Sequence, residues 1–568
     1  MIKKIIECVP NFSEGRNMQV IKEITDQIEK VEGVKLLNVD PGAATNRTVV
    51  TFVGEPQQVV EAAFRAIKRA AEVIDMKHHT GEHPRMGATD VCPLIPISGV
   101  TMEECADYAR ALAKRVGEEL SIPVYCYENA AFEPKRKNLA NCRSGEYEGL
   151  PKRFTDPEWR PDFGPASFTE SVAHTGATAI GARDFLIAIN FNLNTTSTRR
   201  ANAIAYDVRE KGRKKREGNP FTGKVVKDEK GDDVWLPGTL KGCKAIGWFI
   251  EEYGIAQVSM NVTDLSATPV HIAFDEVVAK ASARGIRVTG SEIVGLIPKR
   301  VLIDAGKFYL AKQSRSAGVS EEEIIKIAVK SMGLDDLKPF DPQEKVIEYL
   351  IENRAEKRLI DLTCRGFAME TARESPAPGG GSVSALMGSM GAALGTMVAN
   401  LSSHKAGWDE RWEYFSEWAE KGQQIISEML ILVDEDTNAF KKIMEAFGLP
   451  KGSDTEKEAR SKAIQEATLY ATAIPFKTME VAYRAFDLIE AMVKEGNPNS
   501  VSDAGVGALA LRSAIFGAYM NVRINSKDLK DRVVADAIVE EAQLIFDKTI
   551  LREKQITDAV LKTLQKTS

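Results

Sequence analysis

The stretch VKLLNVDPGAATNRTVVTFVGEPQQVVEAAFRAI (residues 34–67) decides the fold of the first half of the chain. Two runs rich in Val, Leu and Thr, at 34–39 and 47–53, flank a turn that contains Pro and Gly. An amphipathic helical pattern follows at 56–74. This order of two strands and a helix indicates a sheet that is covered by helices on one face.

The neighbouring segments extend the pattern to β-α-β-β-α-β, and the same order recurs further along the chain. In the first copy the predicted strands are 3–9, 34–39, 47–53 and 91–96, and the helices 18–31 and 56–74. In the second copy the predicted strands are 185–192, 243–251, 255–262 and 285–288, and the helices 198–211 and 269–283. We therefore expect a duplicated split-βαβ, or ferredoxin-like, unit with a substrate cleft between its two sheets.

A polar insertion at 212–242 interrupts the second copy and contains the charge run RKKR at 213–216. Surface loops tolerate insertions of this kind because their backbone is already hydrated. We expect a solvated loop there.

The character of the sequence changes after residue 351. A highly charged stretch covers 352–358, and apolar residues then recur at helical spacing to the C-terminus. Long helices with short connections predict an antiparallel bundle. The predicted organisation is α/β plus all-α, with domains at 1–184 and 185–351, a linker at 352–360 and a helical domain at 361–568.

Composition restricts the class of protein. A chain of 568 residues is expected to form two to four domains. The hydrophobic fraction of 43% and charged fraction of 27% are typical of globular proteins. A net charge of -6 argues against nucleic acid as the main partner, because such binding needs a basic face.

Cysteine usage and the N-terminal sequence bear on the compartment. The seven cysteines are scattered and never spaced as CxxC, which favours a reducing compartment and disfavours a zinc knuckle. The start MIKKIIECVPNF has no signal-like apolar stretch, and no window approaches 18 uninterrupted apolar residues. We expect a cytoplasmic protein without a membrane partner.

The segment HHTGEHPRMGATDVCP (78–93) carries three of the six histidines. His79 and His83 are four residues apart, as in a helical zinc pair, but Gly81 and Pro84 disfavour a helix there. A catalytic base fits His83 better, because imidazole titrates near neutral pH. Arg85 could hold a carboxylate. A solvated loop histidine remains an equally simple interpretation of this segment alone.

Three further loops carry residues suited to polar ligands. VPNFSEGR (9–16) follows the first strand, and DPGAATNRT (40–48) joins the second and third, so both could meet at one sheet edge. Asp40 could anchor the histidine, and Arg47 could clamp a carboxylate. PDFGPASFTESVAHTGATAIGAR (161–183) is rich in small residues that permit close approach to a flat ring. Ordinary turn chemistry is the alternative for each loop.

Four of these motifs together resemble the glutamate formiminotransferase family. They are ECVPNFSEG, DPGAATNRTVVTFVG, GEHPRMGATDVCP and GARDFLIAIN, in that order within residues 1–351. The resemblance implies transfer of a formimino group from N-formimino-L-glutamate to nitrogen-5 of tetrahydrofolate, in histidine degradation and one-carbon metabolism. It implies that His83 is the base. The folate- and substrate-binding residues that we expect in this half are Asp40, Asn46, Arg47, Arg85, Gly164, Pro165, Ala166, Ser167, Phe168 and His174.

One helical stripe in the second half contains an acidic residue. Apolar positions in IISEMLILVDEDTNAFKKIMEAFGLP (425–450) are spaced by four and three from Met429 to Phe447, and Asp436 falls on the same stripe. Asp434 is rotated by about 200° around the helix axis and should point elsewhere. A carboxylate in an apolar seam is costly unless it is paired, so we expect a functional group. A structural aspartate bonded to a neighbouring helix is the alternative.

Two other motifs of the helical half contain glycines. SPAPGGGSVSAL (375–386) places three glycines before a helix with Ser382 as its expected N-cap, and it lacks the Lys-Ser/Thr pair of a P-loop. NPNSVSDAGVGALALRSAIFGAYMNVRIN (497–525) places Asp503 at a helix start. The exposed amides of the glycine turn could face an anion, although a tight turn between helices explains it equally well.

The motifs SPAPGGGSV, LVDEDTNAF, SDAGVGA and FGAYMNVRIN resemble formimidoyltetrahydrofolate cyclodeaminase from about residue 360 to the C-terminus. The resemblance implies closure of nitrogen-10 onto the formimino carbon, loss of ammonia and formation of 5,10-methenyltetrahydrofolate, with Asp436 as the catalytic residue. The expected folate-binding residues of this half are Gly379, Gly380, Gly381, Ser382 and Asp503.

The combined resemblance implies tetrahydrofolate as co-substrate, no metal or nucleotide, and a homo-oligomer with folate sites between subunits. The expected substrates are formiminoglutamate and tetrahydrofolate polyglutamates. Two alternatives stay open. The helical domain could be a non-catalytic folate-binding and oligomerisation platform, or the donor could carry a formyl group in place of a formimino group.

Overall fold

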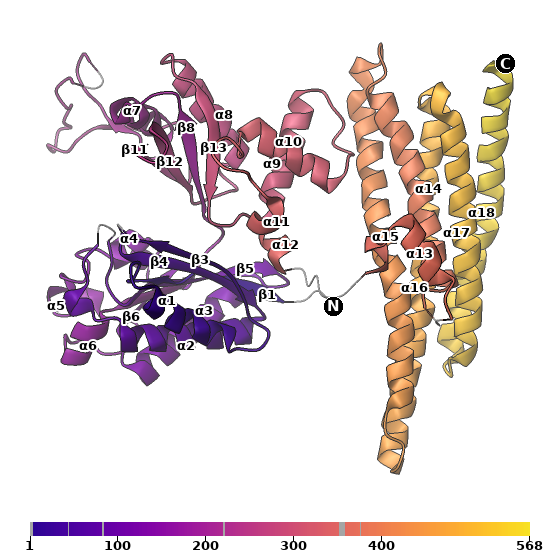
Figure 1. Ribbon diagram of the computed structural model, residues 1–568, viewed down its shortest axis with the longest axis horizontal. Helices are drawn as coiled ribbons and strands as arrows, with labels where there is room; N and C mark the ends of the chain where they lie inside the picture. Colours follow the sequence, from indigo (N-terminus) through magenta and orange to yellow (C-terminus); the bar gives the residue numbers. More distant parts are fainter. Residues whose placement is uncertain are drawn as a thin grey trace. The chain divides into compact units, whose positions relative to one another are not determined.

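The computed structural model describes residues 4–43, 45–81, 84–219, 222–351, 358–374 and 377–567. The chain divides into two compact units (Figure 1). The first comprises Met1–Leu302 and Met332–Glu352, and the second comprises Ile303–Ser331 and Asn353–Ser568. The predicted linker at 352–360 falls largely on residues 352–357, which lie outside the described residues.

The larger sheet of the first unit has seven strands. They are β1 (Ile5–Cys8), β2 (Asn11–Phe12), β3 (Lys35–Gly42), β4 (Arg47–Gly54), β5 (Thr89–Ser98), β6 (Val124–Glu128) and β7 (Thr178–Ala182). Strand β1 lies between β4 and β5 and is antiparallel to both, and β3 is antiparallel to β4. Strands β7 and β6 continue the sheet beyond β5 in parallel.

Three helices cover one face of this sheet: α1 (Met18–Glu29), α2 (Pro56–Val73) and α3 (Met102–Leu120) (Figure 1). Alternate residues of β1 point toward them, so that Ile6 and Cys8 are completely buried in a core with Ile28 and Ile67. Glu7, between them, points to the opposite face because successive strand side chains alternate. The helices thereby leave the other face of the sheet to form a site.

The four predicted strands and two predicted helices of this half are confirmed, with ends shifted by a few residues. Strands β6 and β7 were missed. Every residue of β7 is buried, and its sequence TAIGA has neither alternation nor large side chains. Strands that are buried on both faces lose the period of two from which a strand is recognised.

The second sheet of the first unit has the order β11-β12-β8-β13, and all neighbours are antiparallel. Its strands are β8 (Ile187–Leu193), β11 (Cys243–Ile250), β12 (Ile255–Val262) and β13 (Val288–Val294). Helices α7 (Thr198–Val208) and α8 (Val270–Ser282) cover one face (Figure 1). The predicted strand at 285–288 was misplaced, because Gly285 forms a turn with positive φ and the strand begins only at Val288.

The insertion at 212–242 is mainly exposed, as predicted, but it contains a short hairpin of β9 (Arg213–Lys214) and β10 (Trp235–Leu236). Its residues 220 and 221 lie outside the described residues. The remaining short helices of the first unit are α4 (Leu139–Cys142), α5 (Leu150–Arg153), α6 (Glu170–Thr175), α11 (Pro342–Lys345) and α12 (Ile347–Ile351).

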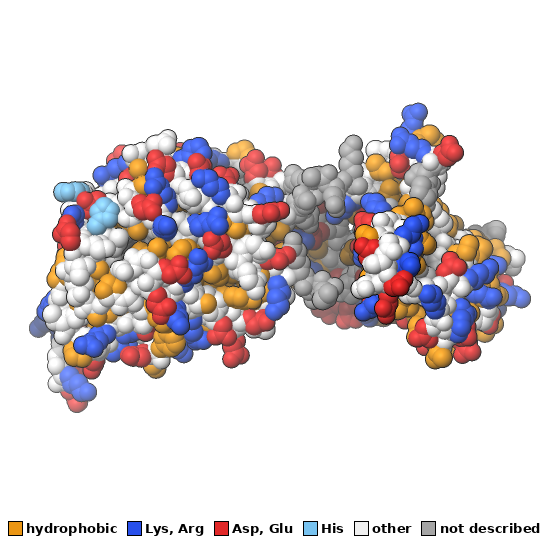
Figure 2. All heavy atoms as spheres, turned by 90° about the horizontal axis from the view of Figure 1, so that it is seen from below, with side chains coloured by type: hydrophobic (Ala, Val, Ile, Leu, Met, Phe, Trp, Pro, Cys, Tyr) orange, Lys and Arg blue, Asp and Glu red, His pale blue; other side chains and the backbone are white. Residues whose placement is uncertain are grey.

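Figure 2 shows basic and acidic side chains interspersed on the visible surface.

The described part of the second unit is helical. Its long helices are α14 (Gly380–Ser403), α15 (Trp412–Gly448), α16 (Asp454–Glu495), α17 (Val501–Asn525) and α18 (Arg532–Thr567), preceded by the short α13 (Cys364–Thr371). Helix α14 packs against α15, α16 and α17. It is long and apolar enough to cross a membrane by length and composition, yet 61% of its most apolar window is buried within the unit, as in the core helix of a bundle.

Parts of two helices from the middle of the chain pack on this unit. They are the portions of α9 (Lys299–Lys312) and α10 (Glu321–Met332) that fall within Ile303–Ser331. Lys307 Nζ lies 2.7 Å from Glu420 Oε2, and Asn400 Nδ2 donates to the Gly318 carbonyl at 2.7 Å. The helical unit therefore includes residues that precede the predicted linker.

Candidate active sites

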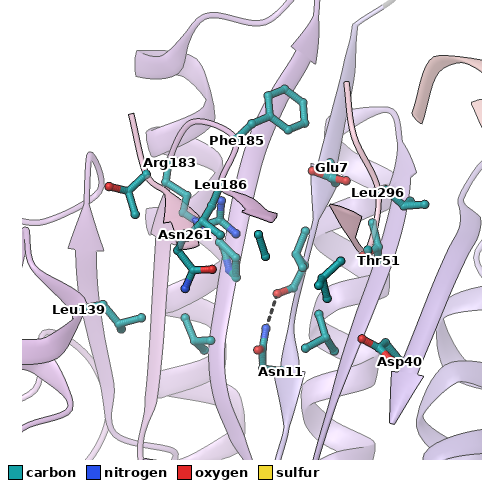
Figure 3. Close-up of a pocket in the computed structure, with 18 of the residues that line it drawn as sticks. Glu7, Asn11, Asp40, Thr51, Leu139, Arg183, Phe185, Leu186, Asn261 and Leu296 are labelled. Carbon is teal, nitrogen blue, oxygen red and sulfur yellow. Dashed lines mark hydrogen bonds between the residues drawn. The ribbon is translucent and has the colours of Figure 1, made fainter. Parts of the chain in front are cut away.

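A cavity of about 410 Å³ lies between the two sheets of the first unit. Figure 3 shows side chains from both sheets directed toward the space between them. Glu7 of β1 and Asp40 of β3 enter from the larger sheet, and Asn261 of β12 enters from the smaller one. The predicted cleft between the sheets is thus present.

The charged and amide residues of the cavity are drawn from several strands and loops. Its basic residues are Arg47, Arg143, Arg183 and Lys244, its acidic residues are Glu7 and Asp40, and its amide residues are Asn11, Asn38 and Asn261. Guanidinium groups bind carboxylates in two-pronged pairs. The cavity is therefore suited to a small ligand that carries more than one carboxylate.

Arg47 and Asp40, both predicted site residues, line this cavity. Arg47 donates a hydrogen bond to the Asn11 side-chain oxygen. Burial lowers the pKa of the Arg47 guanidinium to about 10, so the group is still a cation near neutral pH. Asp40 is exposed at the rim, opposite Val49 in the β3–β4 ladder.

Glu7 was not predicted as a site residue. Its side chain is only 4% exposed although it faces the cavity. Burial raises the pKa of its carboxyl to about 7, and Arg183 opposes this rise while Glu348 adds to it. The available sequence signal is the alternation in β1. Ile6 and Cys8 lie on the helix-covered face, so Glu7 between them must point to the opposite face of the sheet.

Asn46 ties together the loops that were predicted to meet at one sheet edge. Its side-chain oxygen accepts from the Gly15 amide at 3.0 Å, its amide nitrogen donates to the Thr80 carbonyl at 2.9 Å, and its own carbonyl lies 2.9 Å from His79 Nε2. The meeting of these loops is confirmed. Asn46, predicted to bind substrate, instead uses both ends of its amide inside the protein.

His83 and Glu82 lie outside the described residues. Gly81, just before them, packs against the Asn46 loop so closely that an added Cβ would lie 2.2 Å from the Thr45 carbonyl oxygen. The backbone that leads to the predicted base is therefore held by the same loop as Arg47.

Arg85, which follows the histidine, was predicted to hold a substrate carboxylate, and in this structure its guanidinium is paired with two carboxylates of the protein. Its guanidinium donates to Glu148 at 2.7 Å and to Glu146 at 3.2 Å, and its Nε donates to His79 Nδ1 at 3.3 Å. A guanidinium with two carboxylate partners has little left for a third. Both ring nitrogens of His79 have protein partners as well, which disfavours the zinc pair.

The predicted folate stretch, residues 164–174, does not contribute to the cavity lining among the described residues. Gly164 adopts a φ of +83° against Ile122, and Phe168 packs edge-on against Tyr147. The intervening Pro165, Ala166 and Ser167 lie along a largely exposed segment. His174 Nδ1 lies 3.3 Å from Asp75 and borders a separate, open depression of about 550 Å³. The expected folate contacts thus point to a second surface of the same unit.

Asp436 of α15 meets the N-terminus of α14 in the helical unit. Its carboxylate accepts hydrogen bonds from the Ser382 amide at 2.8 Å and the Ser382 hydroxyl at 3.0 Å. Burial raises the pKa of this carboxyl, although both bonds from Ser382 oppose the rise. Asp436 is half-buried, and its bonds to Ser382 of α14 agree with both interpretations of the sequence, a functional group and a structural aspartate.

The glycines before Ser382 make room for the Asp436 carboxylate. A Cβ on Gly381 would lie 2.0 Å from Asp436 Oδ1, and a Cβ on Gly380 would lie 3.3 Å from the Asn521 side-chain nitrogen. Ser382 was predicted as the N-cap, which is wrong: Gly379 is the N-cap and Ser382 lies within the first turn. Asp436 satisfies its amide from another helix.

The rest of the predicted stripe on α15 is partly confirmed. Met429 and Val433 are completely buried, whereas Phe447 at the stripe's far end is 51% exposed. Phe447 lies one residue before the helix ends, where Arg460 donates to its carbonyl. Asp434 points elsewhere as predicted and accepts from the Leu359 amide at 2.6 Å.

Asp503, predicted to bind folate, lies far from Asp436 within one chain. Asp503 lies in the first turn of α17, whereas Asn521, near Gly380, lies in its last turns. The 18 residue steps from Asp503 to Asn521 span about 27 Å of helix. The SDAGVGA motif therefore lies at the other end of the α14–α17 pair.

Among the described residues, no group of three or more His, Cys, Asp or Glu side chains is arranged to hold a metal ion. Both candidate sites rely on carboxylates, guanidinium groups and amides. Their common chemistry is the binding of small charged molecules and the transfer of protons.

The sequence matches three family profiles. "Formiminotransferase domain, N-terminal subdomain" matches residues 5–183, "Formiminotransferase domain" matches residues 188–352, and "Formiminotransferase-cyclodeaminase" matches residues 363–544. The first two cover the cavity-bearing sheets, and the third covers Asp436 and the glycine turn.

Curated relatives match either nearly the whole chain or one part of it. The chain is 43% identical over 533 residues to the formimidoyltransferase-cyclodeaminase of Mus musculus, with 94% of each chain covered. It is 40% identical over 307 residues to the glutamate formimidoyltransferase of Streptococcus pyogenes serotype M1, covering 54% of this chain and 93% of the relative. It is 36% identical over 193 residues to the methenyltetrahydrofolate cyclohydrolase of Methylorubrum extorquens, covering 34% and 93%.

Proposed function

Because this chain belongs to the formimidoyltransferase-cyclodeaminase family, we propose that its two units hold two separate sites for consecutive steps on one folate. The chain is a bifunctional folate enzyme. It transfers the formimino group from N-formimino-L-glutamate to tetrahydrofolate, and it cyclises the product to 5,10-methenyltetrahydrofolate with release of ammonia.

The transferase step belongs to the cavity of the first unit. N-formimino-L-glutamate carries two carboxylates, and Arg47 and Arg183 line the cavity. Arg143 also lines it but is already paired with the buried Asp90 carboxylate. The attacking nitrogen-5 of tetrahydrofolate must lose a proton as it adds to the formimino carbon, and the departing glutamate nitrogen must gain one. His83 is the proposed base, and the Asn46 contacts that fix the approach to Gly81 support this assignment.

The cyclodeaminase step belongs to the meeting point of α14 and α15. Ring closure requires removal of a proton from nitrogen-10 and its delivery to the departing ammonia. Asp436 is the proposed relay, because burial raises the pKa of its carboxyl, which makes the carboxylate a stronger proton acceptor than an ordinary aspartate. The single observation that carries this assignment is the double hydrogen bond from Ser382, which fixes the carboxylate in one orientation.

Folate is proposed to contact residues 164–174 in the first unit and the Gly379–Gly381 turn in the second. The positive φ of Gly164 and the open depression beside His174 support the first contact. Backbone amides at the start of α14 support the second, since such amides attract anions. Polyglutamate tails of folate supply anions of this kind.

The finer architecture is proposed as a duplicated ferredoxin-like unit followed by an antiparallel helical bundle. The strand order β3-β4-β1-β5 in the larger sheet matches β11-β12-β8-β13 in the smaller one, which supports the duplication. A bond from the Asn497 amide to Ser402, together with the proximity of Gly380 to Asn521, supports antiparallel packing of α14 and α17.

We further propose a cytoplasmic homo-oligomer in which subunits share folate sites. Met390 on α14 and Val506 and Leu509 on α17 are 52%, 56% and 47% exposed and line one apolar groove. The distance of Asp503 from Asp436 within one chain also supports a contribution from a second subunit. The measurement is the mass of the protein in solution by light scattering, and a monomer would contradict the proposal.

The experiment that tests the proposed function supplies the whole protein with formiminoglutamate and tetrahydrofolate. The expected products are glutamate, ammonia and the absorbance of methenyl-folate. If the helical unit were only a binding platform, formimino-folate would accumulate and no ammonia would form above the uncatalysed rate.

A further inference from the structure

The Glu7 carboxylate is buried in the transferase cavity, and none of the residues that the structure describes bonds to it. Its side chain is 4% exposed and faces the cavity from the centre of the larger sheet (Figure 3). In the described part of the chain no donor makes a hydrogen bond or ion pair with it. A buried carboxylate without a partner is destabilising, so a structural role does not account for Glu7.

Part of the wall of the cavity that Glu7 faces is apolar. Val9, Phe185 and Leu296 line the same cavity and belong to one hydrophobic cluster with Ile347. Arg183 is the cation whose charge acts on Glu7. A carboxylate in such a pocket attracts a cation more strongly than it would in water, because the low dielectric weakens screening.

The donor substrate offers a cation of matching shape. The formimino group of N-formimino-L-glutamate is an amidine, which is protonated near neutral pH and then presents two N–H groups in one plane. A carboxylate binds such a planar pair with two parallel hydrogen bonds, as it does a guanidinium. The corresponding formyl group is a neutral amide and cannot supply this charge.

We propose that Glu7 selects the formimino donor over a formyl donor by pairing its carboxylate with the amidinium group in the cavity. This inference rests on the proposed transferase site and names its specificity-determining residue. The basic residues of the cavity would then hold the two donor carboxylates, and Glu7 would hold the group that is transferred.

Pairing of Glu7 with a cation should release protons from the protein when the donor binds. The pKa of Glu7 is about 7 in the open cavity, and an adjacent amidinium lowers it, so binding at pH 7 releases part of a proton. A neutral formyl analogue produces no such release. The other charged groups that line the cavity or act on Glu7 are Asp40, Arg47, Arg143, Arg183, Lys244 and Glu348.

The first experiment compares wild type with Glu7→Gln, which keeps shape and removes charge. We expect kcat/KM for formiminoglutamate to fall by about 30-fold or more, the usual effect of removing one member of a buried charge pair. The dissociation constant of N-formylglutamate, measured in the absence of tetrahydrofolate, should change by less than about threefold, because this compound forms no charge pair with Glu7.

Glu128→Gln is the matched control. Glu128 is the last residue of β6, its pKa is also raised by burial, and Arg183 and Lys244 act on it, yet it does not line the cavity. Its removal changes the local charge equally and should leave the preference between the two compounds unchanged. Equal losses in Glu7→Gln and Glu128→Gln would overturn the inference.

The second experiment needs no variant. Calorimetry of wild-type protein with formiminoglutamate alone, in two buffers of different ionisation enthalpy at pH 7, should show proton release that N-formylglutamate does not show. Equal proton exchange for both compounds would contradict the pairing. If wild type transferred no formimino group to tetrahydrofolate, the proposed function itself would fail, whereas active transfer with an unaltered Glu7→Gln preference would refute only the role of Glu7.

Discussion

The two units each bury one acidic residue at a proposed site, but they treat it in opposite ways. In the helical unit, Asp436 accepts two hydrogen bonds from Ser382, which hold the carboxylate against the start of α14. In the first unit, Glu7 faces a cavity of about 410 Å³, and its carboxylate makes no hydrogen bond to any residue that the structure describes. Burial raises the pKa of both carboxyl groups.

This difference separates two uses of a buried acid. A carboxylate that is fixed by the protein has one orientation and is ready to transfer a proton to a bound substrate. A carboxylate without a protein partner has its bonding capacity available to a ligand. The raised pKa alone therefore does not identify the role, and the hydrogen bonds around each acid do.

The largest expected effect comes from Asp436→Asn. The variant should lower the rate of cyclisation of supplied formimino-folate by about 100- to 10,000-fold, the usual contribution of a general acid or base. Methenyl-folate absorbance measures this rate. The control is Asp434→Asn, two residues away, whose carboxylate bonds the Leu359 amide. Similar losses in both variants would mean that the helix is disturbed and that Asp436 has no special role.

Gly381→Ala tests whether the orientation of Asp436 matters. Its added Cβ would lie 2.0 Å from Asp436 Oδ1, so the carboxylate must move. A displacement of about 1 Å should lower cyclisation by about 100-fold, while formimino transfer in the first unit stays unchanged. Gly448→Ala, at the end of α15 where a Cβ meets no atom within 4 Å, is the control. Normal cyclisation in Gly381→Ala would show that the carboxylate position is not critical.

Glu7→Gln should stabilise the first unit at high pH. The pKa of Glu7 is raised from 4.5 to about 7, so the folded state binds more protons than the unfolded state between these values. The free energy of unfolding of wild type therefore falls as the pH rises through this window, and that of the variant does not. At pH 8 the variant should be more stable by on the order of 3 kcal/mol, with little difference at pH 4.5.

Urea unfolding of both proteins at the two pH values measures this difference. A variant that is less stable than wild type at pH 8 would show that Glu7 has a stabilising partner in the folded protein. The contrast between Glu7, whose carboxylate has no bond to a described residue, and Asp436, whose carboxylate is bonded, would then be wrong.

Ser382→Ala is expected to have the smallest effect. Loss of the hydroxyl removes one of two hydrogen bonds that oppose the rise in the pKa of Asp436, so this pKa should rise further. The limb of the pH–rate profile of cyclisation that reports Asp436 should move to higher pH, with a rate loss of about tenfold or less. The control is Ser389→Ala, because the Ser389 hydroxyl donates to the Leu386 carbonyl within α14. This variant should leave the pH–rate profile unchanged. If the profile of Ser382→Ala did not shift, the Ser382 hydroxyl would have no effect on the pKa of Asp436 during cyclisation.

The sequence was sufficient to find Asp436, because a helix of 37 residues repeats its buried stripe often enough to make one acidic position stand out. The same reasoning could not find Glu7. Strand β1 has four residues, and a single Glu there is equally consistent with an exposed face. Only the second sheet, almost 200 residues later in the chain, turns that face into a cavity.

The elements were predicted where alternation or helical spacing was strong, as in β4, β12 and α2. Strands β6 and β7 were missed because they are buried on both faces. Asn46 was assigned to substrate with the motif resemblance and Arg85 from its charge beside the histidine. The sequence did not predict their partners Gly15, Glu146 and Glu148, which lie far away in sequence. Such long-range contacts have no local signature.

The central claim is that the two steps occur at two independent sites, and one assay of a pair of variants tests it most directly. Both steps are measured separately in His83→Ala and in Asp436→Asn, with formiminoglutamate and tetrahydrofolate for transfer and supplied formimino-folate for cyclisation. The account predicts that His83→Ala cyclises at the wild-type rate without transferring, and that Asp436→Asn transfers at the wild-type rate without cyclising. Loss of both steps in either variant would contradict it.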